Sequence, residues 1–386
     1  MSKKGLYIFI LCILLLFSNS VVRSQSLLPS YVYYTIITEY TFHNVGNTTI
    51  FINSSNISPG FYLALDIDGW QKLLNFSLYK DDILLNDIIV EKDDSGNRKI
   101  LTRNLLKLEP RNKITLKLIQ VIRVNTVSIF SSSRKKITLP KKSPMLYTKY
   151  NMSDVNNYLY SKGFWNISKS IEEISNNLAS NVATVNQYIL SIIRWTLNNI
   201  KYNISKSGGI IPPELVVIRK TGACGEISSL IVSLARAKGI PSYLYLAYYY
   251  DPKINMSNKN GLYSYEMIHV FQHVFAMVYI DDITSVPIDL TLPKRKVGEE
   301  LETINGAGIN TMDRIIILNK ITHEDPNEFL MVASPDNNIS MRYKVIVIRK
   351  NPSIGKGIAS NVFILLFLLF LIIAVILLFL RDTENL

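Results

Sequence analysis

Cys224 is the residue whose type and surroundings are best suited to chemistry in this chain. The other cysteine, Cys12, lies in a short apolar run near the N-terminus that we expect to be removed. A lone thiol cannot form an intramolecular disulfide, so Cys224 is either a small buried hydrophobic residue or a nucleophile. Without its neighbours the inert alternative would be the commoner one, so the surrounding residues must decide.

Cys224 is predicted to open a helix. Gly239 is suited to end that helix as a C-cap, and Pro241 prevents its continuation. The helix dipole and the free N–H groups of the first turn favour an anion, and these N–H groups can form part of an oxyanion hole. Gly222 and Gly225 predict a tight entry to the helix and close approach of a substrate backbone. The apolar face is expected to consist of Ile227, Leu230, Ile231, Leu234 and Ala235.

A thiol nucleophile needs a base and a group that orients the base. His273 begins a predicted strand over residues 273–280, and Asp289 lies in a second short strand over residues 285–290. We expect the two strands to form a β-hairpin that places Asp289 beside His273. The chain has four histidines: His43, His269, His273 and His323.

Two other arrangements use residues from the same region. His269 could act as the base instead of His273. A metal ion could be held by four side chains of suitable type, Cys224, His269, His273 and Asp289. Their spacing contains no paired-ligand motif, so we expect neither a metal nor a cofactor. Glu226 is expected to stabilise the first turn of the helix rather than to act as an acid.

Four segments together resemble the transglutaminase-like superfamily: residues 222–226, 235–241, 273–275 and 286–291. They share the family's order and spacing, and the resemblance extends over about residues 145–293. It implies a papain-like α+β core with a Cys–His–Asp triad. The triad implied by this match is Cys224 as nucleophile, His273 as base and Asp289 as orienting carboxylate.

The chain departs from the family pattern in two respects. Phe275 stands where the family often has tryptophan, and Ser285 and Val286 lie near a second such place. An upstream side chain that would complete the oxyanion hole is not identifiable, and Trp195 and Gln272 are candidates by type only. Both departures bear on turnover more than on the fold.

The rest of the chain predicts an α+β protein of several parts. Residues 31–137 contain runs rich in β-branched and aromatic residues separated by turns, which predicts an N-terminal β-sandwich. The resemblance also implies a sandwich, because one often precedes the core in secreted members. The predicted parts are a signal peptide at 1–24, a β-sandwich domain at 25–140, the transglutaminase-like core at 141–293, a β-containing extension and juxtamembrane linker at 294–356, a transmembrane helix at 357–381 and a cytoplasmic stub at 382–386.

Both ends of the chain predict a single-pass membrane protein whose catalytic part is extracellular. Lys3 and Lys4 precede an apolar run followed by small residues, which is typical of a secretory signal. Residues 362–380 contain no charged residue and are long enough to span a bilayer. Glycosylation sequons agree with this location, and none interrupts the stretch around Cys224. They lie at Asn47, Asn53, Asn56, Asn75, Asn151, Asn166, Asn203, Asn255 and Asn338.

These observations predict a cell-surface thiol enzyme that acts on a protein or peptide substrate. We expect a peptide or carboxamide carbonyl to acylate Cys224, and water or an amine to release the acyl group. Water is slightly favoured because a tethered enzyme faces bulk solvent. The net charge of +12 indicates an acidic partner or a basic exterior, and no basic stripe predicts nucleic-acid binding. The alternatives are a catalytically silent adhesion or envelope-scaffold protein, and a glycan-binding module with an aromatic-lined face on residues 31–137.

Overall fold

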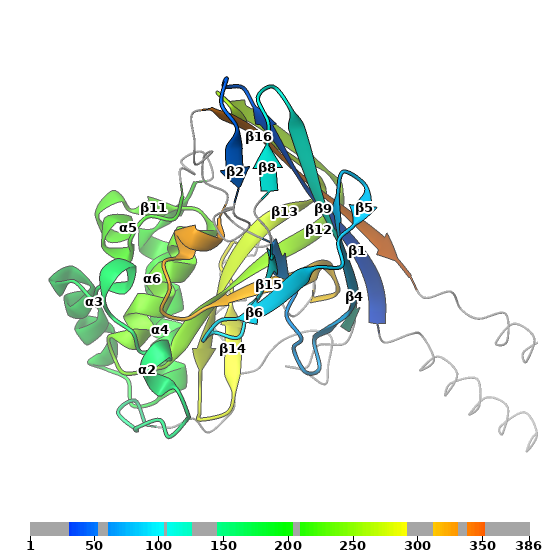
Figure 1. Cartoon of the computed structure of the whole chain (residues 1–386). Coiled ribbons are helices and arrows are strands. Elements are labelled where there is room, and N and C mark those ends of the chain that lie inside the picture. The colour runs from blue at the N-terminus through cyan, green and yellow to red at the C-terminus, as the bar shows by residue number, and fades with distance from the viewer. Residues whose placement is uncertain are drawn as a thin grey trace, which may run out of the picture. The chain divides into compact units, whose positions relative to one another are not determined.

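The computed structural model describes most of the chain between residues 31 and 351 (Figure 1). The predicted signal peptide, transmembrane helix and cytoplasmic stub lie outside the described residues. Within the described part, no helix has both the length and the apolar character needed to cross a bilayer. The described ranges are 31–52, 61–103, 106–125, 145–203, 209–291, 312–330 and 338–351.

A nine-stranded sheet runs through the fold. Its order is β15-β12-β13-β16-β1-β9-β4-β5, with β14 paired to β13, and every pair is antiparallel except β13 with β16. The strands are β1 (Tyr31–Asn44), β4 (Gln71–Lys80), β5 (Ile83–Leu84), β9 (Lys113–Asn125), β12 (Ser242–Asn260), β13 (Tyr263–Tyr279), β14 (Ser285–Ile288), β15 (Ile315–Ile321) and β16 (Ile339–Lys350).

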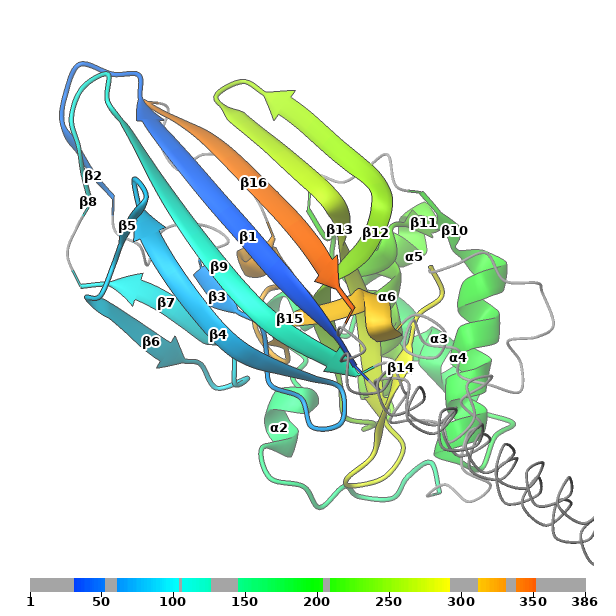
Figure 2. The ribbon, with the colours of Figure 1, turned by 90° about the vertical axis from the view of Figure 1, so that its right-hand side faces the viewer.

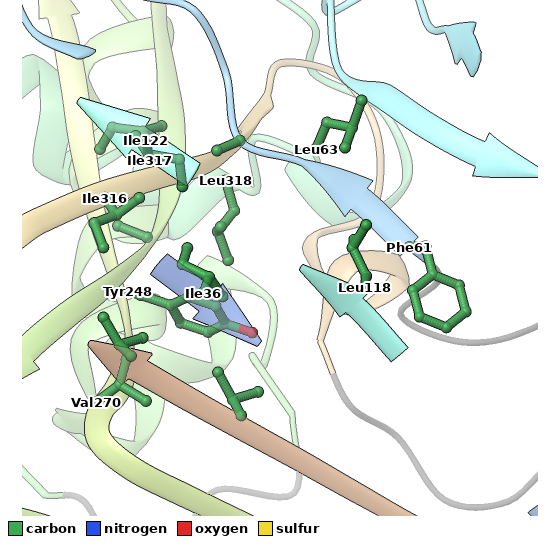
Figure 3. Close-up of a cluster of buried hydrophobic side chains, with 14 of the residues drawn as sticks. Ile36, Phe61, Leu63, Leu118, Ile122, Tyr248, Val270, Ile316, Ile317 and Leu318 are labelled. Carbon is green, nitrogen blue, oxygen red and sulfur yellow. The ribbon is translucent and has the colours of Figure 1, made fainter. Parts of the chain in front are cut away.

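The N-terminal strands bury one face of this sheet. Burial alternates residue by residue along β1 and β9, as a strand with one covered face requires. The strands of two smaller sheets contribute to the same core, in which Ile36 and Leu118 lie near Phe61 and Leu63 (Figure 3). The small-sheet strands are β2 (Ile50–Ile52), β3 (Phe61–Leu63), β6 (Ile88–Lys92), β7 (Arg98–Thr102) and β8 (Leu106–Leu108).

The N-terminal strands and the predicted core share one sheet, unlike the separate sandwich domain that the sequence suggests. The reason is β16, which pairs with β1 from Tyr33 to Asn44 and with β13 from Tyr263 to Ile268. Figure 2 shows β16 between β1 and β13. Residues 31–350 accordingly form one compact unit. The predicted boundary at residue 140 lies outside the described residues.

The helices gather on the side of the molecule away from the N-terminal strands (Figure 1), and they confirm the α+β class. α6 is central, because all its residues from Gly225 to Arg236 are buried. It ends as predicted, with Gly239 at φ 70° and the N–H of Ile240 donating to the carbonyl of Ala235. The helical elements are α2 (Val155–Tyr158), η3 (Gly163–Trp165), α3 (Lys169–Ala179), α4 (Val185–Asn199), α5 (Pro213–Arg219), α6 (Cys224–Arg236), η5 (Met312–Arg314) and η6 (Pro326–Phe329).

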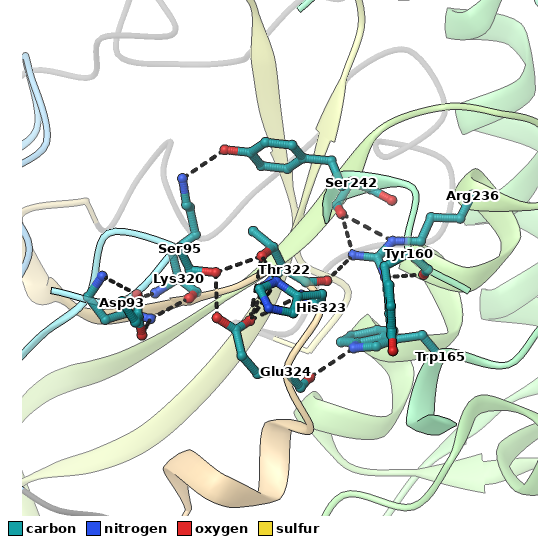
Figure 4. A network of polar contacts seen from close by, with 12 residues as sticks. Asp93, Ser95, Tyr160, Trp165, Arg236, Ser242, Lys320, Thr322, His323 and Glu324 are labelled. Atoms are coloured by element: carbon teal, nitrogen blue, oxygen red, sulfur yellow. Dashed lines mark hydrogen bonds and ion pairs between the residues drawn. The ribbon is translucent and has the colours of Figure 1, made fainter. Parts of the chain in front are cut away.

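A buried guanidinium at the end of α6 joins this helix to the sheet (Figure 4). Arg236 is 4% exposed, and it donates to the carbonyls of Tyr160 (2.7 Å), Ser242 (2.7 Å) and Thr322. Its guanidinium also lies 4.5 Å from the ring centre of Trp165. Burial lowers the pKa of Arg236, and the charge of nearby Glu324 opposes this shift. One side chain therefore fixes three separate segments around the helix.

The turn between β6 and β7 extends this network toward the N-terminal strands (Figure 4). The Ser95 hydroxyl contacts that of Thr322 at 2.6 Å and donates to the Glu324 carboxylate at 2.5 Å. Asn97 exchanges hydrogen bonds with the backbone of Lys320 at 2.7 and 2.8 Å. These contacts lock residues 95–97 onto β15, so the N-terminal part and the helical part are joined by side chains as well as by the sheet.

Candidate active site

Cys224 is the first residue of α6. Ala223 precedes it in an extended conformation, and its N–H donates to Oε2 of Glu226 at 3.0 Å. Burial raises the pKa of Glu226, while hydrogen bonds from the N–H groups of Glu226 and Ala223 act in the opposite direction. Glu226 thus caps the first turn, as expected from the sequence. Its contacts hold the peptide units that lead into Cys224.

The two glycines beside Cys224 make room for the protein's own side chains. A Cβ atom on Gly225 would lie 2.5 Å from Cδ1 of Ile210, and one on Gly222 would lie 2.7 Å from Cβ of Glu226. The sequence suggests that these glycines allow close approach of a substrate backbone. That interpretation is wrong, because the side chains of Ile210 and Glu226 already occupy the space beside these two glycines.

His273 and Asp289 form a buried pair, as the predicted hairpin requires. β13 and β14 are antiparallel neighbours with Ala276 opposite Ile288, and Asp289 directly follows β14. His273 Nε2 lies 2.6 Å from Asp289 Oδ2, and the two residues are 2% and 0% exposed. The other carboxylate oxygen accepts the N–H and the hydroxyl of Thr291, both at 2.9 Å. Both oxygens of Asp289 are therefore fixed in direction.

The Cys224 side chain interacts with the same imidazole. Burial lowers the pKa of His273, but the charge of Asp289 and hydrogen bonds to Asp289 and Cys224 outweigh burial and raise it to about 10. Burial raises the pKa of Asp289, and the charge of His273 with hydrogen bonds from His273 and Thr291 brings it below its ordinary value. Because Nε2 of His273 is hydrogen-bonded to Asp289, Nδ1 is the ring nitrogen that remains to interact with the thiol. The structure thus brings the three predicted triad residues together.

The His273–Asp289 pair should make stability depend on pH. The raised pKa of His273 adds stability that is complete below its ordinary value of 6.5 and is lost as the pH rises toward about 10. The lowered pKa of Asp289 adds stability that is present above its ordinary value of 3.8 and is lost in acid. Wild type should therefore exceed Asp289→Asn in free energy of unfolding most clearly between about pH 4 and 6.5.

Urea denaturation of both proteins at about pH 5.5, 7.5 and 9.5 measures this difference, which should shrink at each step. A difference that stays constant or grows with pH would mean that pairing with Asp289 does not raise the pKa of His273 in the folded protein.

The structure gives no support to the two alternatives from the sequence, His269 as the base and a metal site that includes it. His269 has a φ of 61° and sits where the β12–β13 register shifts, between the pairs Tyr250–Val270 and Asn255–Ile268. The buried pair with Asp289 involves His273 instead. Among the described residues, no three histidine, cysteine or acidic side chains are arranged to hold a metal ion.

Aromatic packing explains how Phe275 can stand where tryptophan is common in the family. The ring of Phe275 stacks near His273 at 6.1 Å between centres and near Trp70 at 6.1 Å. Trp70 is fully buried and precedes β4 in the N-terminal part. Trp70 from the N-terminal part therefore packs against Phe275, whose ring lies beside that of His273.

The two oxyanion candidates chosen by type lie on α4 and on β13. Gln272 lines a small cavity of about 30 Å³ together with Tyr248, Asn319 and Tyr343. Trp195 is half-buried on α4, where it packs against the hydrophobic core around the helices.

Tyr202 lies near the site, and the sequence alone does not identify it as a neighbour of Cys224. It ends the two-residue strand β10 (Lys201–Tyr202), which is parallel to β11 (Thr221–Gly222), with Tyr202 opposite Gly222. Burial and the charges of Cys224 and Asp289 raise the pKa of Tyr202 to about 12. Two residues are too few to produce a periodic signal, so only the long-range pairing with β11 shows where this tyrosine lies.

The same pairing brings one glycosylation sequon to the site. The N–H of Asn203 donates to the carbonyl of Gly222 at 3.0 Å. No sequon interrupts the stretch around Cys224 in the sequence, but this pairing brings half-buried Asn203 close to it in the fold. Asn53 and Asn56 lie outside the described residues. The other six sequon asparagines are exposed: Asn47, Asn75, Asn151, Asn166, Asn255 and Asn338.

Two solved structures of other proteins are similar to this chain. A crystal structure of a putative cysteine protease from Cytophaga hutchinsonii is similar over 84% of this chain and 91% of its own, with 14% identity and a TM-score of 0.50. At that identity the likeness shows the fold alone. The periplasmic domain of TgpA from Pseudomonas aeruginosa, bound to ethylmercury, aligns over 66% of this chain and 88% of its own, with 12% identity and a TM-score of 0.26.

No curated protein matches the chain. The family model of the transglutaminase-like superfamily matches residues 172–290, a range that begins in α3 and ends just after Asp289. It contains Cys224, His273 and the hairpin that carries Asp289. Residues 172–290 of this chain are therefore a transglutaminase-like domain.

Proposed function

We propose that this protein is a thiol enzyme that transfers acyl groups from peptide or carboxamide substrates through Cys224. The observation that carries the proposal is the buried 2.6 Å contact between His273 and Asp289, with the Cys224 thiol on the other side of the same imidazole. A nucleophile, a base and an orienting carboxylate in this order are the parts that acyl transfer needs. A helix begins at the nucleophile, which adds N–H groups directed at developing negative charge.

The proposed reaction has two steps. In the first, His273 already carries the proton, as its raised pKa implies, and Sγ attacks the substrate carbonyl carbon to give a tetrahedral intermediate. The intermediate collapses as the C–N bond breaks, and His273 gives the proton to the departing amine. In the second step, water or an amine attacks the thioester while His273 takes its proton. The C–S bond then breaks, which leaves the sulfur of Cys224 beside protonated His273 as at the start of the cycle. Asp289 holds the ring and stabilises the imidazolium throughout.

Hydrolysis is the favoured outcome of the second step in this proposal. Cys224 is partly exposed, so water can reach the thioester. We propose further that this part of the protein lies outside the cell on a membrane anchor. Support comes from the apolar runs at the two ends of the sequence and from the exposure of six sequon asparagines.

The proposal is tested by trapping the acyl-enzyme. The full-length protein, in detergent, is mixed with a peptide library whose members carry glutamine or a C-terminal amide, and the reaction is quenched in acid. Intact-mass analysis and peptide mapping should find an added acyl group on Cys224, with release of ammonia or an amine. Addition of hydroxylamine should remove the adduct. If no adduct forms and iodoacetamide fails to label Cys224 at neutral pH, the domain is a silent scaffold and the proposal is wrong.

A further inference from the structure

Three exposed apolar side chains lie on the elements that lead to Cys224. α5 buries Val216 but exposes Leu215 (36%) and Ile218 (65%), which lie about one helical turn apart on the same face. Tyr202 on β10 is 50% exposed. We call Leu215, Ile218 and Tyr202 the apolar strip. Apolar surface that is gathered in one place and rimmed by polar residues marks a binding site more often than scattered side chains do.

Backbone pairing holds the apolar strip near the nucleophile. β10 is parallel to β11, with Tyr202 opposite Gly222, and β11 leads from α5 into α6 (Figure 2). The N–H of Lys201 donates to the carbonyl of Lys220 at 2.9 Å, which ties β10 to the end of α5. Cys224 follows Lys220 by four residues, so their Cα atoms are at most about 14 Å apart. An extended substrate covers that distance with about four residues.

Exposed cations rim the apolar strip. Lys201 belongs to β10, Arg219 is the last residue of α5 and Lys220 follows it, and all three are exposed. Among the described residues these three form no ion pair, whereas the surface cation Arg342 is paired with a carboxylate. The exposed acid of α5 is Glu214, in the first turn of that helix. The surface from α5 to β10 therefore combines apolar side chains with a net positive charge.

We propose that the apolar strip and its three cations bind an acidic and apolar segment of a peptide substrate, so that carboxamides within such segments are the substrate class of Cys224. This inference rests on the proposed function and specifies its substrate. The cations attract Asp or Glu side chains a few residues from the reacting carboxamide, and the strip covers a large apolar side chain of the same segment. These contacts are the same before and during the reaction, so they should lower KM more than they raise kcat.

The test measures release of ammonia from a matched set of glutamine peptides by the full-length protein in an uncharged detergent. The parent peptide carries two glutamates and a leucine within about four residues of the glutamine. Replacing both glutamates with serine should lower kcat/KM about tenfold, and replacing them with lysine about fiftyfold, mainly through KM. Replacing the leucine with serine should lower kcat/KM about tenfold. The preference for glutamate should weaken in about 0.5 M salt.

Variants of the protein test whether this surface is the one that selects. Lys201→Glu combined with Arg219→Glu should raise KM for the parent peptide at least about tenfold and should make the lysine peptide the better substrate. Lys72→Glu combined with Lys113→Glu is the matched control, because both lysines are exposed on the N-terminal strands β4 and β9 and the change in net charge is the same. The control should leave KM for every peptide within about twofold of wild type. Ile218→Ser should remove the preference for leucine over serine.

Three results would overturn the inference. Equal kcat/KM for all the peptides would show that the surface does not select, while turnover itself would leave the proposed function standing. Equal changes in KM for the two double variants would show that only the net charge of the protein acts on the substrate. If wild type turns over no peptide and forms no adduct on Cys224, the proposed function itself fails, and the substrate class fails with it.

Discussion

Replacing Cys224 with alanine should abolish turnover of any peptide or carboxamide substrate, with kcat falling by at least about 10⁵-fold. The reason is that the proposed covalent intermediate cannot form without Sγ. The folded state should change little, because the substitution removes one partly exposed atom and should cost about 1 kcal/mol or less of unfolding free energy. Steady-state kinetics and urea denaturation of the same preparation measure the two effects.

A double variant provides the control for this prediction. Residues that act as a unit are not additive, so Cys224→Ala combined with His273→Ala should be about as inactive as Cys224→Ala alone. Activity of Cys224→Ala within about tenfold of wild type would show that another group carries the reaction. An additive loss in the double variant would show that the two side chains act independently.

Replacing Arg236 with methionine should have the largest effect on stability, a loss of about 3–5 kcal/mol. Methionine keeps much of the apolar volume but donates no hydrogen bond. The carbonyls of Tyr160, Ser242 and Thr322 would then lose the donor that satisfies them inside the protein. The stacking of the guanidinium on Trp165 would also be lost. Chemical denaturation of the full-length protein should show a lower midpoint.

Arg342 is the matched control for Arg236. Its side chain is 59% exposed, and it pairs with Glu266 at 2.7 Å on the surface. Surface ion pairs contribute little, so Arg342→Met should cost less than about 1 kcal/mol. Equal losses in the two variants would mean that the network around Arg236 contributes no more than a surface pair. A proportionate loss of activity in Arg236→Met is expected only near its unfolding transition, because Arg236 lies at the opposite end of α6 from Cys224.

The parts of the site that follow from local signals were predictable from the sequence. The start of α6 at Cys224 and its end near Gly239 depend on capping and helical spacing within one short segment. The hairpin that joins His273 to Asp289 depends on two neighbouring strands and the turn between them. In both cases the chemistry-bearing residue lies at the boundary of an element, where sequence signals are strongest.

The parts that depend on distant pairing were not predictable. Tyr202 reaches the site only because β10 pairs with β11 some twenty residues later. Gly225 suggests that a substrate backbone can approach closely, but the side chain of Ile210, which is distant from α6 in local pattern, occupies the space beside it. The sheet that joins the N-terminal strands to the core forms because β16, which lies late in the sequence, pairs with both β1 and β13. No local pattern encodes a partner at such a separation.

The position of β16 has a consequence for the order in which this protein can fold. Until residues 339–350 have been synthesised, β1 can pair with β9 on one edge only, and its other edge has no partner strand. The first residues of β13 can pair only with β12. Contacts between such distant segments carry a large loop-closure cost and form slowly. The nascent chain therefore contains Cys224, His273 and Asp289 before the strands around them can all pair. Completion of the sheet around the hairpin that carries His273 and Asp289 therefore depends on β16, the last strand of the described residues.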